Sequence, residues 1–235
     1  MTKYTNQQNN HITEPAVVML KMQHRNMRNY NYLVVDPETR QAVIVDPAWE
    51  PEKVEQALDE TSANLVGVLL THSHHDHINL AKSVSEQYRV PIWMSRQEIE
   101  YSNFQAPALE AIDETPIFFG DSVVMPILTP GHTPGCTCYQ VGSNLFTGDV
   151  LFAEGCGICP DEAAAHDMFH SLNMLKRRIA PDTRIYPGHS YGKLPGQKFV
   201  NLLTENIYLQ FPDKTSFAAF RLRKSQNRAS MFRFK

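Results

Sequence analysis

Four histidines and one aspartate lie within residues 72–77, and imidazole and carboxylate groups are typical ligands of catalytic zinc sites. An apolar run at residues 64–70 precedes them and predicts a buried strand, while residues 78–88 predict a helix. The cluster therefore occupies a turn at the carboxyl end of a strand, where α/β proteins place their sites. A metal-scavenging tract is the alternative, but such tracts lie in polar tails and not behind a core strand. We expect an ordered metal site.

The spacing within the cluster divides its side chains between two ions. Residues two apart in an extended chain point to the same side, so His72 and His74 can bind one ion together. Asp76 and His77 follow as the chain turns, and we expect them to face a second ion. His75 is left over, and we predict that it is exposed or supports the ligands without binding metal.

Three further candidates, His132, Asp149 and His189, each end a predicted strand beside a glycine, which lets the backbone turn sharply. Each is a weak signal alone, but with the cluster they complete two sets of three ligands and a bridging carboxylate. The first set is His72, His74 and His132, the second is Asp76, His77 and His189, and Asp149 is the bridge. Two ions about 3.5–4 Å apart can share a hydroxide and hold it as a nucleophile. Asp76 and Asp149 are the candidate catalytic carboxylates.

The composition is that of an ordinary globular protein. The chain has 235 residues, of which 42% are apolar and 20% charged, enough for one large domain or two small ones. A net charge of −3 argues against broad attraction to nucleic acid or membranes. No apolar run approaches the roughly 20 residues of a membrane span. Residues 1–13 are polar, predict a flexible tail and lack the features of a signal peptide. We therefore expect a cytoplasmic protein that binds neither nucleic acid nor membrane.

The four cysteines, Cys136, Cys138, Cys156 and Cys159, indicate a reducing compartment at this chain length and not a disulfide scaffold. In principle their two pairs could build a zinc site with four sulfur ligands. We favour packing for Cys136 and Cys138, which stand two apart on a predicted strand, while Cys156 lies in a Gly-Cys-Gly turn. The sequence leaves the roles of all four open.

Strand and helix patterns alternate along the rest of the chain. Strands are predicted at residues 16–20, 31–35, 41–45, 64–70, 91–94, 123–128, 136–140, 144–146 and 184–186, and helices at residues 51–60, 78–88, 163–180 and 198–211. Residues 23–29 predict a polar loop, and residues 97–115 predict a partly helical flap over the site.

Four short motifs carry a resemblance to a known family. They are Thr-His-x-His-x-Asp-His at residues 71–77, Pro-Gly-His-Thr-Pro-Gly around His132, Gly-Asp at Asp149 and Pro-Gly-His at His189. Over residues 15–195 the chain resembles the metallo-β-lactamase superfamily. The motifs at residues 147–152, 155–157 and 168–172 resemble its glyoxalase II branch. More narrowly, residues 150–225 resemble the zinc hydrolases encoded in bacterial polyketide clusters that use free-standing acyltransferases.

The resemblance implies an α/β fold, a four-layer αββα sandwich with a short C-terminal helical extension. It implies a hydrolase domain at residues 14–195, with residues 196–235 forming a helix and a basic tail packed on the same domain. It also implies two Zn²⁺ per chain, with Fe or Mn as alternatives, because imidazole and carboxylate suit several divalent metals.

Two departures from the family bear on the substrate. Glyoxalase II members carry a larger helical C-terminal domain that helps to bind glutathione, and only a short segment follows His189 here, which argues against glutathione thioesters. Ile158, Cys159 and Pro160 stand where the glyoxalase pattern has Arg after Gly-Cys-Gly, so this loop is remodelled.

The ligand set and the resemblance together predict a metal-dependent thioesterase. A hydroxide held by both metals would attack an acyl thioester on an acyl carrier protein or coenzyme A, and the thiolate would leave without a dedicated general acid. Other hydrolases of the fold, of glyoxalase II or lactonase type, and an iron persulfide dioxygenase are alternatives. The dioxygenase would use one iron and leave Asp76 and His77 unligated. A non-catalytic binding module is disfavoured because the ligand set is intact.

Six basic residues and no acidic one lie in residues 221–235. A solvated basic tail is one interpretation. The other is a surface that docks the phosphate of a phosphopantetheine arm or an acidic carrier protein, for which the planar guanidinium group is suited. Arg221 and Arg223 are the candidate substrate-binding residues.

Overall fold

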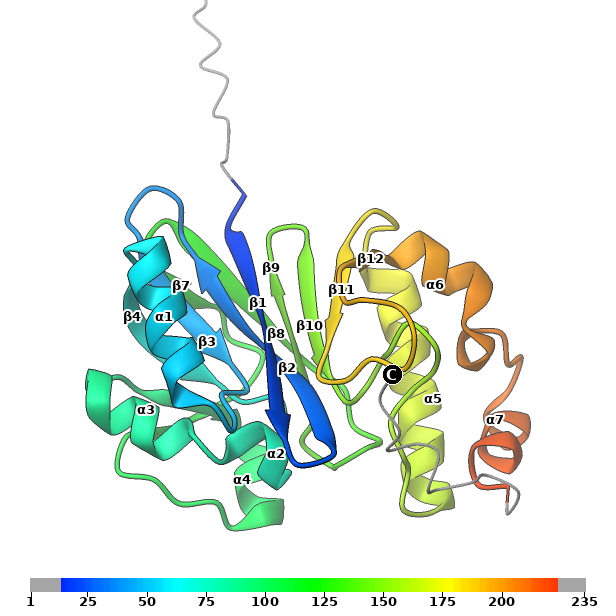
Figure 1. Ribbon diagram of the computed structural model, residues 1–235. Helices are drawn as coiled ribbons and strands as arrows, with labels where there is room; N and C mark the ends of the chain where they lie inside the picture. The colour runs from blue at the N-terminus through cyan, green and yellow to red at the C-terminus, as the bar shows by residue number, and fades with distance from the viewer. Residues whose placement is uncertain (1–13, 224–235) are drawn as a thin grey trace, which may run out of the picture.

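The computed structural model describes residues 14–223, and two mixed six-stranded sheets form its centre (Figure 1). The first sheet has the order β1-β2-β3-β4-β5-β6 and the second β12-β11-β10-β9-β8-β7, so each sheet is built from one contiguous half of the chain. The first comprises β1 (Ala16–His24), β2 (Met27–Val35), β3 (Gln41–Val45), β4 (Asn64–Leu69), β5 (Ile92–Ser95) and β6 (Leu109–Ile112). The second comprises β7 (Ile117–Phe119), β8 (Ser122–Leu128), β9 (Thr137–Val141), β10 (Asn144–Gly148), β11 (Arg184–Pro187) and β12 (Gln197–Lys198).

Helices cover the outer faces of both sheets. In Figure 1, α1 (Pro51–Thr61) and α3 (Ala81–Tyr88) lie outside the first sheet, and α5 (Glu162–Arg178) lies outside the second. The remaining helices are α2 (His75–Ile78), α4 (Arg96–Ser102), α6 (Phe199–Glu205), the 3₁₀ helix η1 (Ile207–Leu209) and α7 (Lys214–Arg221).

The alternation of side chains along β2 shows why the chain forms layers, because successive residues of a strand point to opposite faces. Tyr32 and Val34 point between the sheets, where the ring of Tyr32 lies 5.3 Å from that of Phe146. Leu33 and Val35 point outward into the core beneath the helices of the first sheet. A third core lies between the second sheet and its helices. Three cores between four layers confirm the αββα sandwich.

Residues 23–29 were wrongly predicted as a loop. β1 and β2 form an antiparallel hairpin in which His24 pairs with Met27, leaving a turn of only residues 25–26. The polar residues at the end of β1 face solvent at one edge of the sheet, whereas Asn29 of β2 is buried and donates to Asp76 O.

Residues 97–115 do not form the predicted flap. They contain most of α4 and the whole of β6, which is the strand at the other edge of the first sheet from β1. No residue of this described segment lines the cavity at the site.

The end of the chain also differs from its prediction. Residues 198–211 are divided between α6 and η1, and α7 follows where only a tail was expected. β12 adds a further strand beside β11, and α7 packs against α5. Residues 1–13 and 224–235, on which the flexible N-terminal tail and most of the basic tail were predicted, lie outside the described residues. Within residues 14–223, no helix combines the length and apolar character needed to cross a membrane.

Candidate metal centre

The predicted ligands lie at the carboxyl ends of strands from both sheets. His72 and His74 follow β4, His132 follows β8, Asp149 follows β10 and His189 follows β11. Neighbouring strands are parallel in β3-β4-β5 and in β10-β11, so their carboxyl ends meet at the same edge. The fold thus brings residues that are far apart in the sequence to one place.

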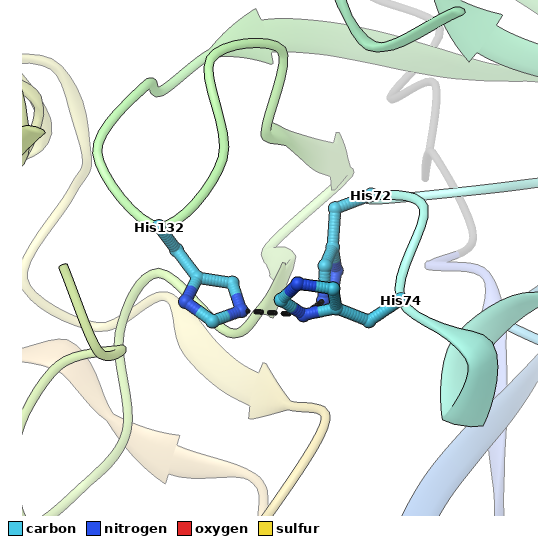
Figure 2. Close-up of side chains that lie close together, drawn as sticks. All are labelled: His72, His74 and His132. Atoms are coloured by element: carbon cyan, nitrogen blue, oxygen red, sulfur yellow. Dashed lines mark hydrogen bonds between the residues drawn. The ribbon is translucent and has the colours of Figure 1, made fainter. Parts of the chain in front are cut away.

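His72, His74 and His132 form the first ligand set (Figure 2). His74 Nδ1 lies 3.1 Å from His72 Nε2 and 2.9 Å from His132 Nε2. Figure 2 shows His132 reaching in from its own loop to face the other two rings. Three ring nitrogens therefore converge on one point, as the sequence predicted.

Asp76, His77 and His189 form the second ligand set. Asp76 Oδ2 lies 3.2 Å from His189 Nε2 and 3.8 Å from His77 Nε2. Asp149 lies between the sets, with Oδ1 3.4 Å from His77 Nε2 and Oδ2 3.6 Å from His132 Nε2. One oxygen of this carboxylate faces each set, which is the arrangement that a bridging ligand needs.

The spacing of these atoms fits divalent metal ions. A tetrahedral ion with bonds of about 2.0–2.1 Å separates its ligand atoms by about 3.4 Å, which is within the range observed here. His77 Nε2 and Asp149 Oδ1 are buried and have no hydrogen-bond partner. Burying such polar atoms without a partner is unfavourable, and a bound cation would supply the missing partner. The donor set therefore suits two ions, one at each set, with Asp149 between them.

In four of the five histidines of the two sets, the N–H group on Nδ1 donates a hydrogen bond to a fixed acceptor. His72 Nδ1 donates to Thr71 Oγ1 (3.0 Å), His77 Nδ1 to Asp46 Oδ2 (2.9 Å), His132 Nδ1 to Ile158 O (2.7 Å) and His189 Nδ1 to Arg28 O (2.8 Å). With Nδ1–H committed in this way, Nε2 of each ring is the atom that can bind a metal once any proton on it has left. Sequence reasoning missed Asp46, because Asp-Pro after a strand also signals a simple turn.

The two sets differ in electrostatics. Burial lowers the pKa of His72 and of His74, and neighbouring histidines lower both further, so the two imidazoles are neutral at pH 7. Burial also opposes protonation of His77, but carboxylates led by Asp149 prevail and raise its pKa to about 10. The pKa of His189 is raised against burial in the same way. A cation at the second set would take the place of these protons, so its binding should release them.

Gly188 holds the second set close to the bridge. A Cβ atom at this position would lie 2.4 Å from His77 Cε1 and 2.9 Å from Asp149 Oδ1. The backbone has little freedom to retreat, because Gly188 N donates to Gly148 O and Gly188 O accepts from Tyr30 N, each at 2.8 Å. Only glycine fits here without displacing a ligand.

A cavity of about 460 Å³ lies over the ligands. Ligand side chains line one side of it: His74, Asp76, His132, Asp149 and His189. Apolar and aromatic side chains line much of the remainder: Met27, Phe152, Ile158, Tyr191 and Tyr208. Glu154 and Arg221 add one charge of each sign. The cavity therefore combines a polar reaction centre with space for an apolar group.

Arg221 and Arg223 occupy different environments. Arg221 is 3% exposed, lines the cavity, and donates from Nε to Gly157 O at 2.7 Å. Its guanidinium group also lies 5.7 Å from the ring centroid of Tyr208. Arg223 is exposed, lies 3.7 Å from the ring centroid of Phe220 and does not line the cavity. Arg221 is therefore not part of a solvated tail, and the structure does not bring Arg223 to the site.

His75 and the cysteines are not among the grouped ligands. His75 is exposed and packs edge-on against Trp49, 5.4 Å between ring centroids. All four cysteines are buried free thiols in the core of the second sheet, and burial raises the pKa of each. Among the residues from 14 to 223, no metal-ligand group includes a cysteine, so a four-sulfur zinc site is not formed.

The fold and the ligand sets define a class of protein: the chain belongs to the metallo-β-lactamase superfamily, whose sequence profile matches residues 26–189. Among solved structures, the metallo-beta-lactamase from Staphylococcus aureus subsp. aureus COL superimposes with a TM-score of 0.78 at 21% identity, covering 89% of this chain and 67% of that one.

Curated relatives place the chain more narrowly. It is 44% identical to "Probable polyketide biosynthesis zinc-dependent hydrolase BaeB" from Bacillus velezensis, over 93% of this chain and 97% of BaeB. Identity to the PksB protein of the same description from Bacillus subtilis is 41%, over 92% of this chain and 96% of PksB. The glyoxalase II likeness is also confirmed: hydroxyacylglutathione hydrolase from Gloeobacter violaceus is 34% identical over 69% of this chain and 64% of that enzyme.

Proposed function

We propose that this protein is a metal-dependent hydrolase of polyketide biosynthesis that cleaves acyl thioesters carried on an acyl carrier protein or coenzyme A. The observation that carries the proposal is a cavity with two converging ligand sets on one side and mainly apolar walls on the others. Likeness to BaeB and PksB supports zinc, hydrolysis and the polyketide setting. The assignment of a thioester as the substrate is supported by the cavity and by likeness to hydroxyacylglutathione hydrolase.

The ligand residues would hold two ions, and bound ions of this kind polarise a carbonyl oxygen and lower the pKa of water. Asp76 lines the cavity beside them. Burial would raise the pKa of Asp76, but without metal a hydrogen bond from His189 and the charge of His77 lower it below its usual range. A bound cation would take the place of these positive charges and would likewise keep the carboxylate ionised. The carboxylate is therefore ionised at neutral pH and can orient the attacking water by accepting a hydrogen bond from it.

Residues around the ligands would fit the rest of a thioester. Met27, Phe152 and Ile158 offer apolar surface to an acyl group. Tyr191 lines the cavity, and burial raises the pKa of its phenol, so the hydroxyl remains a hydrogen-bond donor at neutral pH. The leaving thiolate is stable enough to depart without a dedicated general acid. Arg221 also lines the cavity, and its guanidinium group is suited to a phosphate or carboxylate of the substrate.

Mass spectrometry of a panel of acyl carrier proteins incubated with the enzyme tests the proposal. We expect the acyl mass to be lost from at least one carrier, leaving a free phosphopantetheine thiol, and no loss with Asp149→Ala. Elemental analysis of the same preparation should give about two ions per chain. If the metal-loaded enzyme releases no acyl group from any acyl carrier protein or from acyl coenzyme A, the thioester assignment is refuted. One iron per chain, with oxidation of a persulfide, would instead indicate the dioxygenase.

A further inference from the structure

The first turn of α4 contacts the loop after His132 as well as the loop after β4. Ser95 caps this helix, since its Oγ accepts a hydrogen bond from Glu98 N at 3.1 Å. Ser95 Oγ also donates to Gly135 O at 2.6 Å. A Cβ atom on Gly135 would lie 2.1 Å from Glu98 N, so the helix and the His132 loop are in direct contact.

The carboxylate of Glu98 joins both loops that carry the first ligand set. Its Oε1 accepts from Ser73 N at 2.8 Å and from Ser73 Oγ at 2.6 Å. Its Oε2 accepts from Thr133 Oγ1 at 2.6 Å and from Gly135 N at 3.0 Å. Ser73 lies between His72 and His74, and Thr133 directly follows His132. One oxygen is therefore committed to each loop.

The burial of Glu98 makes these bonds important. The side chain is fully buried, at 0% exposed, and an ionised carboxylate in such a place is tolerated only when its oxygens are hydrogen-bonded. The sequence Ser-x-x-Glu would ordinarily form a capping box, in which the glutamate bonds back to the backbone N–H of the capping residue. Here the serine caps the helix, while the four hydrogen bonds of the glutamate go to the two ligand loops.

We propose that Glu98 is a positioning residue that holds the His72–Ser73–His74 segment and the His132 loop at the separation that the first metal ion requires. It does not line the cavity and acts through its hydrogen bonds to Ser73, Thr133 and Gly135, which stand beside the ligands in the two loops. The inference rests on the proposed metal centre and not on the thioester chemistry, so the two can fail separately.

Glu98→Gln is a sharp test because one of its two terminal atoms becomes an NH₂ donor. Whichever oxygen is replaced, the new donor faces a backbone N–H and a hydroxyl, of Ser73 on one side or of Thr133 and Gly135 on the other. The hydroxyl can turn and accept from the new donor, but the backbone N–H of Ser73 or Gly135 cannot, so one loop must lose its backbone anchor. Loss of a group that orients metal ligands typically weakens metal affinity about 10–100-fold.

Asp36→Asn is the matched control. Asp36 is also a buried carboxylate, 1% exposed, and accepts hydrogen bonds from Thr39 N, Thr39 Oγ1 and Ser122 Oγ. It joins the β2–β3 turn to β8 and contacts neither ligand loop. Both variants should lower the melting temperature of the chelator-treated protein. Only Glu98→Gln should change metal affinity.

The experiment is a competition titration of each purified variant with Zn²⁺ against a chromogenic chelator, with thermal melts in parallel. We expect one of the two binding steps to weaken about 10–100-fold in Glu98→Gln, while both steps stay at wild-type strength in Asp36→Asn. Equal changes in both variants, or no change in Glu98→Gln, would overturn the positioning role. A wild-type protein that binds no Zn²⁺ would refute the metal centre and the role together.

Two milder substitutions keep the test decisive if Glu98→Gln does not fold. Ser73→Ala and Thr133→Val each remove one hydroxyl donor from one loop and keep the charge of Glu98. Each should weaken the same binding step by several-fold, because each variant removes one of the two hydrogen bonds that hold its loop and leaves the backbone N–H bond in place. Unchanged affinity in both variants would overturn the proposal.

Discussion

Gly188→Ala should damage the metal centre without adding any polar group. The new methyl carbon would lie 2.4 Å from His77 Cε1, whereas ordinary contacts begin near 3.4 Å, so the ring or the backbone must move by about 1 Å. Hydrogen bonds from Gly188 N to Gly148 O and from Tyr30 N to Gly188 O hold the backbone, so His77 and Asp149 must yield.

The expected loss is large. Overpacking a site of this kind costs about 1–3 kcal/mol, and misplacing a reacting group by 1 Å can lower the rate about 100-fold. We expect Zn²⁺ affinity to fall about 10–100-fold, measured by chelator competition. Gly192→Ala is the control in the same loop, because its Cβ would meet only Glu154 Oε1 at 3.5 Å. If the two variants bind Zn²⁺ equally and are equally active, close packing of Gly188 does not set the ligand geometry.

Asp149→Ala removes the carboxylate between the ligand sets, so the metal content measured by elemental analysis should fall below about two ions per chain. The control His75→Ala should retain both ions, and equal metal contents in the two variants would refute the ligand assignment. Arg221→Ala should raise KM for a carrier-bound thioester about tenfold or more, whereas Arg223→Ala should leave KM unchanged, because of these two residues only Arg221 lines the cavity. Equal effects of the two substitutions on KM would mean that Arg221 does not contact the substrate in the cavity. Burial would raise the pKa of Asp36, but hydrogen bonds from serine and threonine groups prevail and lower it. Its folded pKa is then below its unfolded value of about 3.9, so its stabilising contribution is present above that pH and is lost as pH falls through the folded pKa. Urea unfolding between pH 3 and pH 7 should show that the free energy of unfolding falls less steeply in acid for Asp36→Asn than for the wild type. The same dependence on pH in both proteins would contradict this.

Buried, apolar elements were predictable from the sequence, and short, half-exposed ones were not. The pattern at residues 64–70 predicted β4 because a central strand buries its side chains. β7 was missed because it has three residues and Phe118, at its centre, is 72% exposed. α7 was missed because the basic run that begins at Arg221, its last residue, suggested a tail, although Asp213 supplies a capping signal by accepting from Ser216 N. The stacking of the layers came from the family resemblance, since periodicity does not say which sheets face each other.

The grouping of the candidate ligands was predictable because local signals coincide at each one. His132, Asp149 and His189 each stand beside a glycine at the end of a strand, and such coincidences are visible in one short segment. The residues that orient the ligands have no such signal. Asp46 and Glu98 are single acidic residues whose partners lie 25 or more positions away along the chain. Their sequence contexts, Asp-Pro and Ser-x-x-Glu, each have an ordinary local explanation, so only the fold reveals their contacts.

Each sheet is formed by one contiguous half of the chain, so metal uptake can report whether the two halves have assembled. β6 ends at Ile112 and β7 begins at Ile117, so a cut within residues 113–116 would release one fragment for each sheet. The first fragment would carry His72, His74, Asp76 and His77, and the second His132, Asp149 and His189. Neither ligand set is complete in either fragment. Zn²⁺ uptake by such a pair should therefore depend on the concentrations of both fragments, and added Zn²⁺ should tighten their association by mass action.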